Sequence, residues 1–273
     1  MQTDLHELMC SINSKIIQKE NFANEEITAF INVFLQKVSS NNAVQRFHQG
    51  VRAPEDGRQM YPLFYIPPYN DGKKLHTLNG VLPKTHIYAA NSYELEILRI
   101  LKIFCKGNPV VENMFNKTKE RLKTTCFGNY CSVGECFEAS LVALRFLSTV
   151  FPDEENWIQT LLDKIKNDID QKLSDKSHSS SLYYYYWLVL DELSIDMSLP
   201  EIQRYENRLK EKLEKGFSIK NDRQKRYNVI AAYIVKNLLS RLPGYAVLQE
   251  IKPYIENNVI YINADKPIQT RLF

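Results

Sequence analysis

Asn91-Ser-Tyr-Glu-Leu-Glu-Ile-Leu-Arg-Ile-Leu101 is one of four related apolar segments that decide the fold. The others are Phe137-Glu-Ala-Ser-Leu-Val-Ala-Leu-Arg-Phe-Leu147, Tyr183-Tyr-Tyr-Tyr-Trp-Leu-Val-Leu-Asp-Glu-Leu193 and Asn228-Val-Ile-Ala-Ala-Tyr-Ile-Val-Lys-Asn-Leu238. Their closing leucines lie 46, 46 and 45 residues apart. A regular period of this size is typical of stacked helical hairpins.

Segments of a second kind lie between these four. Residues 158–173 carry one apolar stripe at helical spacing, and residues 200–217 repeat it more weakly, with Pro200 expected in the first turn. A helix that is apolar all round must be buried, whereas a helix with one stripe covers it. We therefore predict an all-α fold with inner helices near 91–104, 137–150, 182–194 and 226–240. Either an α/α toroid of helical hairpins or an open HEAT-like solenoid satisfies this pattern.

The rest of the chain lies before and after these repeats. With 44% apolar residues and only 9 glycines among 273, the composition suits one helical domain over residues 1–273. We expect an N-terminal helical hairpin in 1–40, with Asn24 as an N-cap, and an irregular proline-rich arm in 41–90. The helical-hairpin repeats then cover 91–257, and a C-terminal tail covers 258–273.

Charge and hydropathy exclude several classes of protein. The formal net charge is +3 with both signs interspersed, so nucleic acid is not the expected partner. The first ten residues lack a basic segment of the secretory type, and no apolar run approaches 18 residues, so no membrane span is expected. A cytoplasmic location with reduced cysteines follows as the default expectation.

Cys126-Phe-Gly-Asn-Tyr-Cys131-Ser-Val-Gly-Glu-Cys136 is the most distinctive motif. Its three thiols stand five residues apart on a glycine-containing loop between an outer and an inner helix, so they can converge on one metal ion. Zinc would take a fourth ligand, and His86 or His178 precedes a neighbouring inner helix. Apart from zinc, no cofactor is indicated. A disulfide or redox pair, or thiols that are only packed as small side chains, are the alternatives.

Two further groups of residues are candidates for chemistry. Carboxylates on or beside inner helices can act as an acid and base pair, or can pair with arginines such as Arg99 or Arg145. These carboxylates are Glu94, Glu96, Glu135, Glu138 and Asp191. Cys136 lies at a predicted helix start, where the helix dipole is expected to lower its pKa. The candidate catalytic residues are therefore Glu94, Glu135, Cys136 and Glu138.

Aromatic residues near the starts of the inner helices can line an apolar pocket, or can simply form the core. The candidate ligand-binding residues are His86, Tyr93, Tyr183, Tyr184, Tyr186 and Trp187.

Gly134-Glu-Cys-Phe-Glu-Ala-Ser-Leu-Val-Ala-Leu-Arg-Phe-Leu147, followed by Phe151-Pro-Asp-Glu-Glu-Asn-Trp-Ile-Gln-Thr-Leu-Leu162, resembles a repeat of the α/α-toroid superfamily. This superfamily contains the terpenoid cyclases and the protein prenyltransferase β-subunits. The resemblance covers residues 85–257 and lies in the form of the repeat. It departs from the family at Asp168-Ile-Asp170-Gln171, which lacks the last acid of the Asp-x-Asp-Asp motif. The later repeats also have no cysteine after Cys136 and no histidine after His178 to hold zinc.

The resemblance implies a protein that binds an elongated apolar molecule of isoprenoid type in a central, aromatic-lined cavity. An enzyme of this kind would be a cyclase or a transferase without the standard acid motif. One alternative is a non-catalytic helical-repeat scaffold that binds another protein. A second alternative is a toroidal glycoside hydrolase-like enzyme with paired carboxylates.

Overall fold

The computed structural model describes residues 4–39, 63–67, 75–174 and 181–262, and most of these residues are helical. The chain divides into two compact units. The first consists of Met1–Lys15 and Asn21–Lys172, and the second of Ile16–Glu20 and Leu173–Phe273. The all-α prediction is therefore confirmed for the described residues. Each unit is described by itself below.

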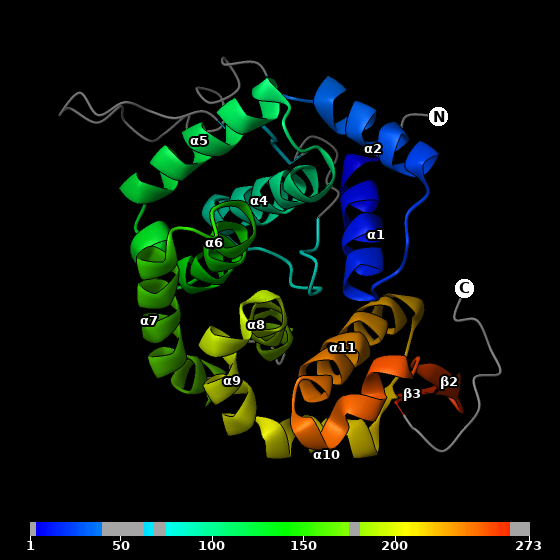
Figure 1. Cartoon of the computed structure of the whole chain (residues 1–273). Coiled ribbons are helices and arrows are strands. Elements are labelled where there is room, and N and C mark those ends of the chain that lie inside the picture. Colours follow the sequence, from blue (N-terminus) through cyan, green and yellow to red (C-terminus); the bar gives the residue numbers. More distant parts are fainter. Residues whose placement is uncertain (1–3, 40–62, 68–74, 175–180, 263–273) are drawn as a thin grey trace. The chain divides into compact units, whose positions relative to one another are not determined.

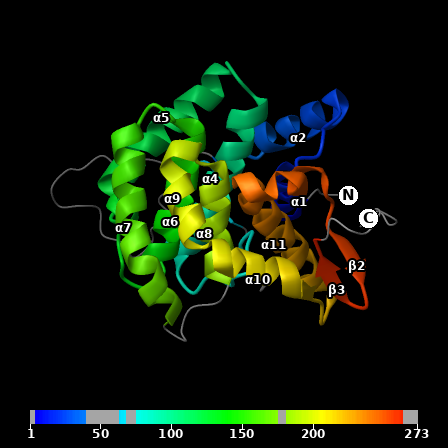
Figure 2. The same ribbon diagram turned by 60° about the horizontal axis from the view of Figure 1, so that its bottom comes forward.

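The first unit is built on two adjacent helices, α4 and α6, which make its most extensive helix pair. Within this unit α5 and α7 lie on the outer side of α4 and α6 (Figures 1 and 2). In chain order its elements are α1 (Leu5–Ile17), α2 (Asn24–Gln36), α4 (His86–Phe104), α5 (Pro109–Thr124), η1 (Phe127–Asn129), α6 (Cys136–Val150) and α7 (Glu155–Ser174).

Burial separates the two kinds of helix as their sequences indicate. Every residue from Ala90 to Leu101 of α4 and from Phe137 to Leu147 of α6 is buried. By contrast, α7 buries a single stripe, which consists of Ile158, Leu161, Leu162, Ile165 and Ile169. Because the inner helices have no polar face, the charged residues that they carry must find partners inside the protein.

The second unit centres on α11, which packs against α8 and η2. All residues from Val229 to Ser240 of α11 are buried. The unit contains α8 (Ser181–Glu192), α9 (Ile195–Arg204), α10 (Glu206–Lys215), β1 (Phe217–Ser218), α11 (Asp222–Ser240), η2 (Pro243–Glu250), β2 (Tyr254–Glu256) and β3 (Val259–Tyr261). The expected inner helices 182–194 and 226–240 correspond to α8 and α11.

A small antiparallel sheet with the order β1-β3-β2 completes this unit, and it includes residues expected to be a tail. Asn257 and Asn258 join β2 to β3 with φ values of 50° and 59°, as a two-residue hairpin turn requires. Gly216, directly before β1, has a φ of 68°, and a Cβ there would lie 2.7 Å from the backbone oxygen of Ile260. Only glycine fits this close crossing of strands.

Two predicted helix boundaries are wrong. Ala23, not Asn24, is the N-cap of α2, and Asn24 is already the first helical residue. Pro200 lies inside α9 instead of opening a helix, and this outer segment divides into α9 and α10 at Tyr205. Asn24 and Pro200 are therefore residues within helices, although each residue type is favoured at a helix start. None of the described helices combines the length and the apolar character needed to cross a membrane.

Candidate metal site on the loop between α5 and α6

The sulfur atoms of Cys126, Cys131 and Cys136 lie within 4.8 Å of one another, and those of Cys126 and Cys136 are 3.8 Å apart. These cysteines belong to the segment of residues 125–136, which we call the three-thiol loop. This loop leads from the end of α5 through η1 to the first residue of α6. Cys126 is exposed and the other two thiols are partly buried. The convergence expected from the cysteine spacing is therefore present.

Side chains of α7 hold the backbone of this loop. Trp157 donates its indole N–H to the carbonyl oxygen of Gly128 at 2.7 Å, and Lys172 donates to that of Ser132. Asp168, between them on α7, accepts the hydroxyl hydrogen of Tyr130. Since these anchors lie on one outer helix, the loop is positioned by the fold.

The Ser140 hydroxyl of α6 holds the backbones of Cys131 and Cys136. Its hydroxyl accepts the backbone N–H of Cys131 at 3.3 Å and donates to the backbone oxygen of Cys136 at 2.9 Å. Tyr130 has a φ of 79°, which is rare for a residue with a side chain. Such a conformation persists only where its surroundings enforce it, and it is often found at functional sites.

The expected lowering of the Cys136 pKa is wrong. Although Cys136 is the first residue of α6, burial raises its pKa to about 12, and the neighbouring thiols of Cys126 and Cys131 add to this effect. Burial and the two neighbouring thiols therefore disfavour the thiolate form of Cys136. A bound cation would reverse this balance, because metal coordination deprotonates a thiol.

Of the two histidines suggested as a fourth ligand, only His86 lies among the described residues. His86 opens α4 with an exposed side chain and does not belong to the three-thiol group, whereas His178 lies outside the described residues. Among the residues that the structure describes, no histidine or carboxylate joins the three sulfurs. Within the described part of the chain, the candidate ligands are therefore these three thiols.

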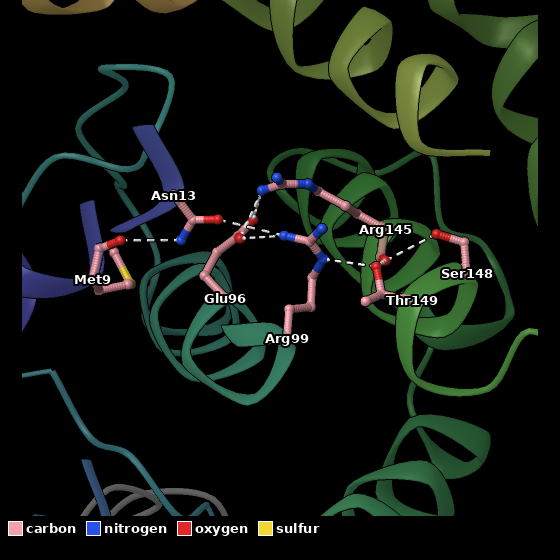
Figure 3. Close-up of polar contacts among 7 residues, drawn as sticks. All are labelled: Met9, Asn13, Glu96, Arg99, Arg145, Ser148 and Thr149. Atoms are coloured by element: carbon pink, nitrogen blue, oxygen red, sulfur yellow. Dashed lines mark hydrogen bonds and ion pairs between the residues drawn. The ribbon is translucent and has the colours of Figure 1, made fainter. Parts of the chain in front are cut away.

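The pairing of carboxylates with arginines is confirmed at Glu96. Its two oxygens lie 2.7 and 2.6 Å from Nη1 of Arg145, and one of them lies 3.1 Å from Nη1 of Arg99 (Figure 3). Arg99 also contacts Asn13 and Thr149. These three charged side chains are at most 2% exposed, so they form a buried network that joins α4 to α6.

The candidate catalytic carboxylates of the first unit are buried or hydrogen-bonded to neighbouring elements. Glu94 is buried, pairs with Arg121 and accepts the backbone N–H of Phe64 at 2.5 Å. Burial raises the pKa of Glu94, and Arg121 opposes that shift. Glu135 accepts the N–H groups of Lys84 and Thr85 at 2.7 and 2.6 Å, which ties the start of α6 to the start of α4. Glu138, in the first turn of α6, is buried.

The candidate ligand-binding aromatics pack against other rings. Tyr93 is buried in the first unit beside His6. In the second unit, Tyr183, Tyr186 and Trp187 all contact the ring of Tyr205. Tyr184 contacts Phe217, and Tyr186 donates its hydroxyl hydrogen to Glu201 at 3.0 Å. These contacts are typical of an aromatic core.

Sequence reasoning did not identify Trp157, Asp168 and Lys172 as residues that support the site. Their spacing of 11 and 4 residues along α7 places them near one face of that helix, which is the signal that could have grouped them. Comparisons with models of known protein families, with curated proteins and with solved structures found no match to this chain.

Proposed function

We propose that this protein binds a thiophilic metal ion, with zinc as the first candidate, through Cys126, Cys131 and Cys136. The observation that carries the proposal is the distance between sulfurs. A tetrahedral zinc ion with thiolates at about 2.3 Å separates its sulfur ligands by about 3.8 Å. The Cys126 and Cys136 sulfurs are 3.8 Å apart, and Cys131 is within 4.8 Å of both.

The chemistry of the donors supports the same conclusion. Thiolates prefer soft and borderline ions such as Zn²⁺ and Cu⁺ over Mg²⁺ or Ca²⁺. Three protein ligands with an open fourth position are typical of zinc sites that also hold water or an exogenous ligand. Because the loop backbone is held by Trp157 and Ser140, little ordering has to accompany binding.

Titration with Co²⁺, which reports sulfur ligands through thiolate-to-cobalt charge-transfer absorption, tests the proposal. The reduced, metal-free protein should bind one Co²⁺ per chain with this absorption, and Zn²⁺ should displace it. Replacement of any one of the three cysteines by serine should reduce the absorption and weaken binding. Cys105→Ser is the matched control, because Cys105 is a partly buried thiol elsewhere in the same unit.

The result for the control decides the outcome. Equal loss of binding in Cys105→Ser and Cys126→Ser, or the absence of charge-transfer absorption in the reduced protein, would contradict the proposal.

The isoprenoid-binding, glycoside hydrolase and protein-scaffold hypotheses stay predictions. The contacts of the residues that motivated the first two have another explanation. Glu94 and Glu96 are committed to arginines, and Trp187 is 1% exposed among neighbouring rings. A structural role in the buried core accounts for the positions of Glu94, Glu96 and Trp187.

A further inference from the structure

We propose that the metal site is also a redox switch, in which a peroxide joins Cys126 to Cys136 as a disulfide and thereby releases the ion. This inference rests on the proposed function, because the switch controls occupancy of the same site. Its geometric basis is the 3.8 Å contact between the Cys126 and Cys136 sulfurs. A disulfide requires these atoms to approach to about 2.05 Å.

The three thiols differ in their access to an oxidant. Cys126 is exposed, whereas Cys131 and Cys136 are partly buried. A hydroperoxide from solvent therefore reaches the sulfur of Cys126 first. The sulfenic acid formed there then lies beside the Cys136 sulfur, which is positioned to attack it.

The reaction balances with a hydroperoxide as the oxidant. The Cys126 thiolate attacks one peroxide oxygen, which gives its sulfenic acid and, from hydrogen peroxide, a hydroxide ion. The Cys136 thiolate then attacks the Cys126 sulfur, forms the S–S bond and expels a second hydroxide. The two sulfurs together lose two electrons, and the peroxide gains them.

Metal release follows from the count of ligands. The disulfide removes two of the three thiolates, and among the described residues Cys131 alone then remains as a ligand. A single thiolate cannot retain an ion that three thiolates hold, because each lost ligand removes a metal–sulfur bond. Reduction of the disulfide restores the three thiols, so the switch is reversible.

The test treats the zinc-loaded full chain with hydrogen peroxide and measures released zinc with a chromogenic chelator. Peptide mapping by mass spectrometry identifies the bond in the same samples. Trypsin does not cleave between Cys126 and Cys136, since residues 126–136 contain neither lysine nor arginine. Chymotrypsin cleaves after Tyr130 and a glutamate-specific protease after Glu135, so a double digest separates all three cysteines.

We expect one zinc released for each Cys126–Cys136 bond formed, with recovery of zinc binding after reduction. Cys105→Ser should behave as the unmodified protein does. Zinc release without this bond, a bond that involves Cys105, or zinc retained after the bond forms would each overturn the switch.

A parallel sample of zinc-free protein, oxidised and mapped in the same way, separates the two proposals. If the protein binds no zinc but forms the Cys126–Cys136 bond, the metal-binding function fails and the thiol pairing stands. If it binds zinc through the three cysteines but forms no such bond, only the switch fails.

Discussion

Glu96→Gln tests whether the buried charge network holds α4 to α6. The substitution keeps the size of the side chain but removes the negative charge that faces Arg99 and Arg145. Because Glu96, Arg99 and Arg145 are 1%, 2% and 0% exposed, water cannot replace the lost charge. Removing one partner of a buried ion pair typically costs about 3–5 kcal/mol. That is a large fraction of the stability of a typical domain, which is about 5–15 kcal/mol.

Urea unfolding followed by circular dichroism measures this loss. With a slope of about 2 kcal/mol per molar urea, a loss of about 4 kcal/mol lowers the midpoint by about 2 M. The control is Glu120→Gln, which breaks the exposed pair of Glu120 and Lys123 in the same unit and should leave the midpoint unchanged. Equal midpoints for Glu96→Gln and Glu120→Gln would refute the argument that burial makes the loss of one charged partner costly.

Three further predictions concern other parts of the molecule. Gly216→Ala should lower the unfolding free energy by at least about 2 kcal/mol, because this backbone conformation is open only to glycine and the strands cross closely there. The control is Gly244→Ala, where an added Cβ meets no atom within 4 Å, and it should unfold at the midpoint of the unmodified protein. Burial raises the pKa of Asp191 from 3.8 to about 6, so the folded state holds this proton more tightly and stability is lost as pH rises through 6. Asp191→Asn, which cannot ionise, should therefore gain roughly 3 kcal/mol over the unmodified protein between pH 4 and pH 7, and urea midpoints that shift in parallel over this range would contradict this. Ser140→Ala should weaken Co²⁺ binding about tenfold, because it releases the Cys131 and Cys136 backbones; unchanged affinity would show that this hydroxyl does not position the thiols.

The positions of the inner helices could be predicted because a helix that is buried on all sides has few polar residues. Between residues 137 and 147, for example, polar side chains are few, and α6 covers this whole segment. The strands of the sheet were harder to predict from the sequence than the inner helices. Its strands have two or three residues, and β1 pairs with residues more than 40 positions away. Pairing of this kind depends on tertiary approach, and the sequence predicted helical repeats up to residue 257 and a tail after it.

The candidate site was predictable only in part. The convergence of Cys126, Cys131 and Cys136 follows from their even spacing on a short loop between two helices. Their environment does not, because the anchors on α7 become neighbours of the loop only through packing. The raised pKa of Cys136 shows the same limit, since its causes, burial and then the neighbouring thiols, arise only in the folded structure.

The charged residues on α4 and α6 show why sequence could not choose between catalysis and structure. Glu96 and Arg145 are 49 residues apart, and an acid on an inner helix is compatible with either role. The contacts with Arg99 and Arg145 in the folded protein identify Glu96 as part of the buried network.

X-ray absorption at the zinc edge tests the central claim most directly, because it counts the sulfur atoms bound to the metal. The zinc-loaded protein should show three sulfur ligands at about 2.3 Å and one oxygen or nitrogen ligand. Cys126→Ser should reduce the sulfur count to two, and Cys105→Ser should leave it at three. A zinc ion bound only by nitrogen and oxygen, or a sulfur count that Cys126→Ser does not change, would contradict the assignment of the three-thiol loop as the metal site.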